Sequence, residues 1–504
     1  MDPNPLCRWS DAALGLLLAA ILAGPAIARG DLVGSPRAET YGHAWVQAYT
    51  AAAWPAWPRG TEMAVGTSSR AVIDPLPTWI AGGIGRVVGL TSAWNVLVVG
   101  WIALAVVGGA ALGRALGVSA TWMGLGLAMA PIWRGSMWSG LTEDGAVGLL
   151  ALALAGIWAG TGREGPWRHL IAGGAALGLL AWCGLYLAWL GAFAAVGIAL
   201  VRLSQTRRVA LRIAVAAILA LAIAAPAAAP FSTRLAGPGH RSGRAPVREE
   251  PLWPVNPWRA ADLASFVLPG LPPGELPLGD ALVREHPTWV GLPTLALAGI
   301  GVGPLAIPVV GIAAWSAGAS PSFLGHPLRT PNPVALALDR LPYASAFNHH
   351  ARLWILGHIG VLVLSGQGLR RLARRFPKLT VLGAPLAIGA MLADAALLSP
   401  GPLTLPGTPS GSPTIYALLA DLPEGPIAVV GATGPGIHPQ KVFYDQRAHG
   451  RRLLANPDQP APVDLGRVRR GTILVALGGS VAHMEMLWGP PVRRDDGGAV
   501  WIAP

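Results

Sequence analysis

Charged residues are scarce in this chain. They make up 12% of its 504 residues, whereas soluble globular domains carry about 25%. Hydrophobic residues account for 53%, and the mean hydropathy is positive, at +0.49. This balance excludes a protein that is soluble throughout its length. It indicates an integral membrane protein for which lipid is the main solvent.

Lysine and cysteine are almost absent. Lys378 and Lys441 are the only lysines, so arginine carries nearly all of the positive charge behind the formal net charge of +12. The arginines are scattered between apolar runs and form no continuous basic stripe, which excludes a nucleic-acid partner. Cys7 and Cys183 lie far apart, in or beside predicted membrane segments. This separation argues against a disulfide framework and against a thiolate metal site.

Long apolar runs are abundant. A membrane-spanning helix needs roughly 20 largely apolar residues, or somewhat fewer where its neighbours shorten it. We therefore predict about eleven spans. They cover residues 11–29, 95–113, 118–132, 144–160, 168–184, 186–202, 208–228, 288–301, 304–318, 351–367 and 378–398. The first run also resembles a signal peptide, but the many later spans favour a retained helix. Glycine pairs at four-residue spacing, Gly109/Gly113 and Gly174/Gly178, would let helices approach closely in lipid.

Arginine and lysine follow a sided pattern in the short loops. With the N-terminus inside, the inner loops carry Arg114, Arg163, Arg168, Arg202, Arg207, Arg208, Arg212, Arg370, Arg371, Arg374, Arg375 and Lys378. The opposite short loops carry only Arg134. Because cytoplasmic loops are enriched in Arg and Lys, we predict a multi-pass protein of the cytoplasmic (inner) membrane with its N-terminus inside. The long loops and the C-terminal tail then lie on the outer face.

The pattern predicts four parts. An N-terminal transmembrane module, 1–230, includes a first outer loop at 30–94, and an outer loop at 231–287 separates it from a second transmembrane module at 288–398. The tail, 399–504, has short β-like runs at 427–430, 472–477 and 499–502 and a helix near 441–454, which predicts a small α/β domain. The glycine cluster 431–436 resembles a phosphate loop, but Pro435 interrupts it and we interpret it as a turn.

The first outer loop has a second periodic stretch. Tyr41 to Trp57 places Trp45, Tyr49 and Ala53 on one helical face, which indicates a helix lying in the membrane interface. A proline-kinked loop that touches lipid is the alternative interpretation.

Ionisable groups near the outer face are the candidates for chemistry, because charges at a membrane are costly. They are Asp31 and Glu39 after the first span, Glu143 and Asp144 at the start of the fourth, and His349, His350 and Arg352 before the tenth. Together they could activate a hydroxyl through a carboxylate and bind a phosphate through arginine. Each also has a structural interpretation. Asp31 could cap a helix, the acid pair could complement a helix dipole, and the histidines could be interfacial.

This layout resembles the GT-C superfamily of multi-spanning membrane glycosyltransferases. The resemblance rests on the position of Asp31, on the segment from Pro75 to Asn95, and on the segments 286–293, 342–352 and 444–451. It implies that Asp31 is the catalytic base for an acceptor hydroxyl. It also implies a donor sugar carried on a polyprenyl phosphate, with Arg352 as a contact for that phosphate.

The leading hypothesis is therefore a glycosyltransferase that moves a sugar from a polyprenyl-phosphate-linked donor to an acceptor at the outer face. It requires no cofactor, although acidic residues beside a lipid phosphate could share a divalent cation. The competing hypothesis is a non-catalytic membrane scaffold or lipid transporter of the cell envelope, whose tail recruits a protein partner.

Overall fold

The chain forms two compact units, each assembled from separate stretches of sequence. The computed structural model describes residues 8–56, 74–162, 164–205, 209–236, 260–268, 287–324, 326–328, 330–340, 350–377, 380–399, 403–430, 441–449, 451, 453–454, 468–477, 480–496 and 498–503. Unit 1 comprises Met1–Leu22, Val98–Trp138 and Thr142–Thr404, and unit 2 comprises Ala23–Leu97, Ser139–Leu141 and Leu405–Pro504. His349, Cys7, the glycine cluster 431–436 and most of the loop 231–287 lie outside the described residues.

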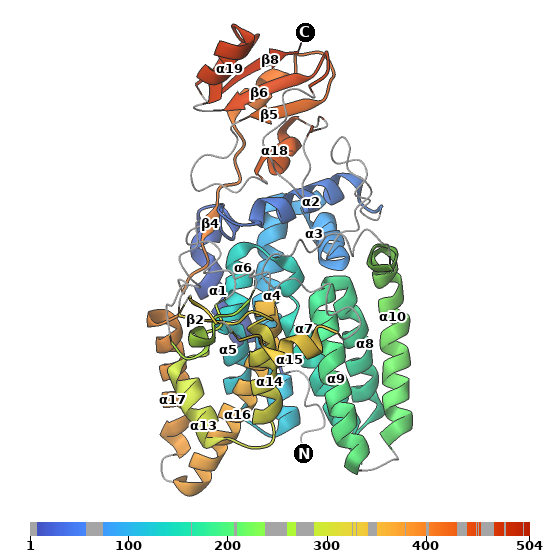
Figure 1. Cartoon of the computed structure of the whole chain (residues 1–504), viewed down its shortest axis with the longest axis vertical. Coiled ribbons are helices and arrows are strands. Elements are labelled where there is room, and N and C mark those ends of the chain that lie inside the picture. The colour runs from blue at the N-terminus through green and yellow to red at the C-terminus, as the bar shows by residue number, and fades with distance from the viewer. Residues whose placement is uncertain are drawn as a thin grey trace. The chain divides into compact units, whose positions relative to one another are not determined.

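Unit 1 is helical (Figure 1). Two helices, α1 (Trp9–Ala28) and α4 (Leu90–Leu116), extend by more than one turn into unit 2, and a third reaches it only with Ser139. The others are α5 (Ala120–Ala128), α6 (Pro131–Ser139), η1 (Thr142–Asp144), α7 (Val147–Gly160), α8 (Trp167–Cys183), α9 (Leu185–Gln205), α10 (Ala210–Ala236), η3 (Leu263–Phe266), α13 (Leu292–Ile300), α14 (Ala306–Ser316), α15 (Pro333–Leu338), η5 (His350–Leu353), α16 (Trp354–Arg375) and α17 (Thr380–Leu397). A short hairpin joins β2 (Ser322–Phe323) to β3 (His326–Pro327).

Within the residues that the structure describes, six helices are long and apolar enough to cross a membrane. They are Trp9–Ala28, Leu90–Leu116, Thr142–Gly160, Leu185–Gln205, Ala210–Ala229 and His350–Arg375. Each of the other predicted stretches also contains a helix, but these fall short of the length or hydropathy of a span; α13, for example, has nine residues. The count of about eleven is therefore not confirmed, whereas a mainly helical fold with several candidate spans is. The orientation of the spans stays a prediction.

The glycine pairs predicted from the sequence lie where helices meet. A Cβ atom on Gly174 or Gly178 would lie 2.9 or 2.8 Å from a backbone oxygen of α10, at Ala216 and Ala220 respectively. The atoms at Gly109 and Gly113 are equally confined by α5. Small residues at four-residue spacing thus give close backbone approach, as membrane helices require.

Unit 2 combines the first outer loop with the C-terminal segment. Its elements are β1 (Leu32–Val33), α2 (Thr40–Ala53), α3 (Pro75–Val88), β4 (Gly407–Thr408), η7 (Thr414–Leu419), β5 (Ile427–Val430), α18 (Lys441–His449), β6 (Ile473–Leu477), α19 (Ser480–Trp488), β7 (Arg493–Asp495) and β8 (Gly498–Ile502). The sheet has the order β5-β6-β8-β7, in which only β5 and β6 run parallel. The three predicted strands and the predicted helix are confirmed, while β7 and α19 were not anticipated.

The core of the sheet follows from the alternation of its strands. Leu474, Ala476 and Trp501 point to one face, where Met484 of α19 covers them. Their neighbours Val475 and Val500 are buried on the opposite face. Because both faces are covered, β5, β6 and β8 are apolar throughout, whereas the edge strand β7 is polar and mostly exposed.

The predicted interfacial helix exists as α2, but part of its aromatic face is covered by protein. Tyr41 lies 5.2 Å from Tyr444 of α18, and Trp45 lies 5.1 Å from Phe443. The Trp45 indole donates to Gln446 Oε1 at 2.8 Å. Tyr41 and Trp45 therefore contact protein, whereas Tyr49 is half-buried and Ala53 is exposed, so the interfacial position of α2 stays a prediction.

Buried ionisable groups accompany this contact between α2 and α18. Asp445 is buried and accepts from Lys441 Nζ at 2.8 and 2.9 Å. Burial raises the pKa of Asp445, and the Lys441 ammonium opposes that rise. Burial raises the pKa of Tyr444 to about 12.

We predict that His449, at the end of α18, lowers the stability of unit 2 in acid. Burial, with Arg451 adding to it, lowers the pKa of His449 to about 4, and its Nδ1 accepts from the Arg451 N–H. An unfolded histidine has a pKa of about 6.5, so the folded state favours the neutral ring and stability is lost as the pH falls from about 6.5 to 4. The loss is expected to be on the order of 1–3 kcal/mol, after allowance for partial exposure.

This acid sensitivity is checked by following thermal unfolding of the full chain in detergent between pH 7.5 and 4.5. His449→Asn keeps an acceptor for the Arg451 N–H but cannot titrate, so its melting temperature should fall less on acidification than that of the wild type. His483 is exposed, and His483→Asn is the matched control. If the melting temperatures of all three proteins fell equally with pH, His449 would not be the source of the acid sensitivity. Because its pKa is raised, Asp445 instead adds stability as the pH falls. This effect should be the same in the wild type and in both variants.

Candidate functional site

Asp31 follows the first spanning helix and is held at its backbone. The Asn95 side chain donates to the Asp31 carbonyl at 2.9 Å and accepts from the Val33 N–H at 3.0 Å. The Trp94 indole donates to the Val33 carbonyl at 2.7 Å. Asn95 and Trp94 are buried on α4. The start of α4 therefore fixes the short strand β1, and with it the backbone of Asp31.

The Asp31 side chain is paired but reachable. Its Oδ2 accepts from Arg29 Nε at 2.9 Å, and 20% of the side chain is exposed. The Arg29 side chain is 57% exposed, so solvent screens this pair and it stabilises the fold by little. A carboxylate with a fixed backbone and access to solvent can accept a proton from a hydroxyl brought to it. The interpretation as a helix cap is not supported, because Asp31 lies beyond the end of α1 at Ala28.

A short segment of the C-terminal half lies beside Asp31 within unit 2. We call residues 405–410 the β4 strap. β4 pairs antiparallel with β1, in the register Leu32↔Thr408 and Val33↔Gly407. Thr408 Oγ1 also donates to the Gly34 carbonyl at 2.6 Å. Sequence reasoning missed the strap, because a pair of two-residue strands so far apart in the chain has no local signal.

Glu39 lies in the same unit, at the start of α2. Its carboxylate is 3.6 Å from His43 Nε2, one helical turn away, and the side chain is 45% exposed. This contact is local to α2.

In unit 1, Glu143, Asp144 and Arg352 come together although 209 residues separate Glu143 from Arg352. Arg352 Nη1 donates to Glu143 Oε1 at 3.1 Å, and Arg352 Nε lies 3.5 Å from Asp144 Oδ2. All three side chains are at most 6% exposed. The Arg352 guanidinium also lies 5.0 Å from the centre of the Tyr186 ring. Buried charges persist only when they are paired, and here one guanidinium serves two carboxyl groups.

Neighbouring groups fix the two acids. Ser136 Oγ donates to Asp144 Oδ2 at 2.9 Å, and the Trp133 indole donates to the Asp144 carbonyl at 3.2 Å. Gly184, between α8 and α9, lies so close to Glu143 that a Cβ atom there would be 2.2 Å from the Glu143 carbonyl oxygen. The acids therefore occupy a packed interior position. Stabilisation by a helix dipole alone does not account for them, because Arg352 is their ionic partner.

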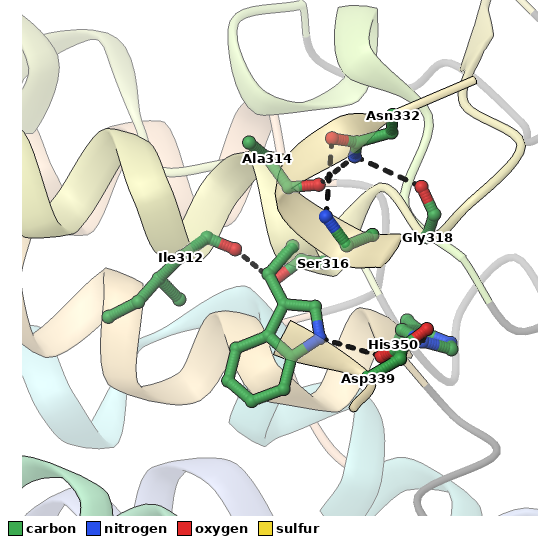
Figure 2. A network of polar contacts seen from close by, with 9 residues as sticks. Ile312, Ala314, Ser316, Gly318, Asn332, Asp339 and His350 are labelled. Atoms are coloured by element: carbon green, nitrogen blue, oxygen red, sulfur yellow. Dashed lines mark hydrogen bonds and ion pairs between the residues drawn. The ribbon is translucent and has the colours of Figure 1, made fainter. Parts of the chain in front are cut away.

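His350 has a different partner. Its Nε2 lies 3.1 and 3.2 Å from the two carboxylate oxygens of Asp339, which also accepts from the Trp315 indole at 2.9 Å. Figure 2 shows this pair beside Asn332, whose side chain donates to the carbonyls of Ala314 and Gly318. His350 and Arg352 share the turn η5, yet they pair with different acids. Asp339 was missed, since it lies in a loop with no periodic pattern.

Asp394 was also missed, although its position carries a signal. It lies within a predicted span, is buried, and accepts from the Trp289 indole at 3.1 Å and from the Leu292 N–H at 3.0 Å. An acid inside an apolar run is costly unless it is hydrogen-bonded, and the two groups that donate to Asp394 are both neutral. We interpret Asp394 as a link between α17 and the start of α13.

A metal ion has no evident binding site in the part of the chain that the structure describes. No group of three or more His, Cys, Asp or Glu side chains there could hold one. Glu143 and Asp144 supply two oxygen ligands between them, but Arg352 is their counter-charge. The divalent cation considered from the sequence stays a prediction, and the mechanism proposed below contains no step through it.

Two solved proteins match the fold over most of the chain. ArnT from Cupriavidus metallidurans in the apo state has a TM-score of 0.44 and 15% sequence identity, with 97% of this chain and 96% of ArnT covered. The structure of ArnT bound to undecaprenyl phosphate has a TM-score of 0.42, with the same identity and coverage. Both ArnT and the second matching protein, AglB, are GT-C membrane glycosyltransferases, the family that the sequence layout resembles.

AglB is an archaeal oligosaccharyltransferase from Archaeoglobus fulgidus, matched in its complex with an inhibitory peptide and a dolichol-phosphate. Its TM-score is 0.49 at 12% identity; 90% of this chain is covered, but the chain spans only 64% of AglB. No family model matches the chain, and no curated protein matches its sequence. At such low identities no residue role is transferred from these proteins.

Proposed function

We propose that this protein is a glycosyltransferase that moves a sugar from a polyprenyl-phosphate-linked donor to an acceptor at the outer membrane face. In the reaction, an acceptor hydroxyl attacks the anomeric carbon of the donor sugar. The bond between that carbon and the phosphate oxygen breaks, and the polyprenyl phosphate leaves with the bonding electrons. The hydroxyl proton passes to the Asp31 carboxylate. This single displacement inverts the anomeric centre and needs no nucleotide.

The observation that carries the proposal is that Asp31 combines a held backbone with a partly exposed carboxylate. Its backbone carbonyl accepts from Asn95, the next two residues pair with the β4 strap, and a fifth of its side chain remains exposed. A carboxylate with only a structural role is usually buried with all of its hydrogen bonds made inside the protein, which is not the case for the partly exposed Asp31. The position also suits the substrate. Asp31 directly follows a helix that can span the membrane, and we propose that a lipid-linked sugar reaches it from the bilayer.

Arg352 is the proposed contact for the lipid phosphate. A planar guanidinium is suited to phosphate oxygens, and this one is already held in place by Glu143 and Asp144. Binding a phosphate would require Arg352 to share its donors between the phosphate and the acids. We also propose a substrate-binding role, as predicted from the sequence, for Glu39, Glu143 and Asp144. The same role is proposed for His350 with its Asp339 partner. For His349 the proposal rests on the sequence alone.

The test is transfer of a radiolabelled sugar by the purified chain in liposomes. Undecaprenyl-phosphate and dolichol-phosphate sugars are the donors, because these carriers differ in chain length and saturation but share the phosphate. Transfer to an envelope acceptor that depends on the protein supports the proposal. If both carriers are bound but no sugar is transferred or hydrolysed with any acceptor, the proposal fails. Movement of the lipid between leaflets would then favour the lipid-transporter alternative.

A further inference from the structure

The β4 strap lies against the Asp31 side chain and pairs with the backbone of the next two residues, Leu32 and Val33. A Cβ atom built on Gly407 would lie 2.2 Å from Asp31 Oδ2, 2.8 Å from Asp31 Cβ and 2.7 Å from Arg29 Nη2. Gly407 thus packs its bare Cα against the ion pair of Arg29 and Asp31. Any side chain at this position would have to displace the carboxylate, the guanidinium or the strap itself.

The requirement at Gly407 is steric rather than conformational. Gly407 is not among the glycines with a positive φ, so alanine could adopt its backbone angles. Gly411, four residues further on, also has an ordinary φ, but nothing lies within 4 Å of a Cβ atom built there. The two glycines therefore form a matched pair, in which the same added methyl group collides with Asp31 at one position and meets open space at the other.

The strap is itself held from both sides within unit 2. On one side, the Gly34 N–H donates to the Pro406 carbonyl at 2.8 Å, next to the β1–β4 pairing. On the other, Tyr41 donates to the Pro409 carbonyl at 3.1 Å and Tyr444 of α18 to the Ser410 carbonyl at 3.3 Å. Arg447 donates to the same Ser410 carbonyl. The strap therefore connects the C-terminal domain to the residue at the end of the first span.

We propose that Gly407 and the β4 strap are positioning elements that set the orientation of the Asp31 carboxylate, so that the C-terminal domain serves the reaction by holding the base. This inference rests on the proposed function, in which Asp31 accepts the acceptor proton. Misplacing a catalytic group by about 1 Å can lower a rate about 100-fold. A methyl group at 407 forces a shift of that size, since 2.2 Å is far below a van der Waals contact.

The experiment compares Gly407→Ala with Gly411→Ala in the full-length chain in nanodiscs. For Gly407→Ala, kcat for sugar transfer should fall by about 100-fold, while KM for the polyprenyl-phosphate donor stays within about twofold. Gly411→Ala should match the wild type. Amide hydrogen exchange of the peptide that contains Val33 and Gly34 should accelerate in Gly407→Ala alone.

A double variant separates positioning from general damage. If Gly407 acts through Asp31, adding Gly407→Ala to Asp31→Asn should cost almost nothing further, because the oriented carboxylate is already absent. Additive losses would overturn the proposal, and so would full activity of Gly407→Ala. If Gly407→Ala does not fold, Thr408→Val replaces it, since it removes the hydrogen bond to Gly34 at nearly constant volume.

The outcome also distinguishes this inference from the proposed function. If the wild type transfers no sugar, the proposed function fails, and the exchange data alone decide whether the strap holds β1. Unchanged exchange in Gly407→Ala would then overturn the strap as a positioning element. If the wild type is active and the two glycine variants are equally active, only the strap proposal fails.

Discussion

Asp31→Asn is expected to lower the rate of sugar transfer by about 10²–10⁴-fold, the range that a positioned general base contributes. The amide is nearly the same size as the carboxylate, so the bond from Asn95 to the carbonyl of residue 31 and the pairing of the β4 strap with Leu32 and Val33 should survive. The lost property is the ability to accept the proton of the acceptor hydroxyl. The assay is initial-rate transfer at saturating donor, with binding of the donor lipid measured separately.

The control for Asp31→Asn is Asp421→Asn, a substitution of the same kind at an exposed position of unit 2. Both variants should unfold at the temperature of the wild type within a few degrees, because the pair of Arg29 with Asp31 is largely solvent-screened. Donor affinity should be unchanged in both. Transfer by Asp31→Asn at the wild-type rate would remove Asp31 as the base, and a large drop in its melting temperature would make its role structural.

The sequence predicts the helices well because a membrane span is encoded locally. Each predicted stretch contains a helix, since a long apolar run can satisfy its backbone in lipid in no other way. The number of spans was less predictable: α5, α13 and α14 are apolar yet only 9 to 11 residues long, and sequence alone does not reveal where an apolar run stops being helical. The strands of the tail were found because β-branched runs are bounded by Gly, Pro and Asp.

The site was predictable in its members but less so in its pairings. Placing Glu143, Asp144 and Arg352 at span ends on one side made their convergence an expectation, which the structure confirms for these three. The same reasoning gave no means of assigning His350 to Asp339 rather than to Glu143. It also did not predict that Trp45 packs against Phe443 of α18. Hydropathy does not distinguish a lipid surface from the apolar face of α18, and the β4 strap is too short to leave any pattern.

Arg352→Met is expected to destabilise the protein by about 3–5 kcal/mol, because it leaves Glu143 and Asp144 buried without their counter-charge. Methionine preserves much of the apolar stem and its packing near Tyr186, so the loss of stability measures the effect of removing the charge. In detergent the melting temperature should fall by about 5 °C or more. Arg374 is exposed at the end of α16, and Arg374→Met should leave the melting temperature within a degree or two of the wild type.

A triple variant shows whether the loss in Arg352→Met comes from unpaired acids. Adding Glu143→Gln and Asp144→Asn to Arg352→Met should recover much of the melting temperature, because no buried charge then remains without a partner. Failure to recover would mean that the guanidinium acts through packing alone.

Transfer activity gives a separate answer. Arg352→Lys retains a positive charge but loses the planar fork, so if Arg352 contacts the phosphate, KM for the donor should rise about tenfold or more even where the fold is retained. A triple variant that regains stability but not donor binding would show that the buried cluster of Glu143, Asp144 and Arg352 serves donor binding rather than the fold.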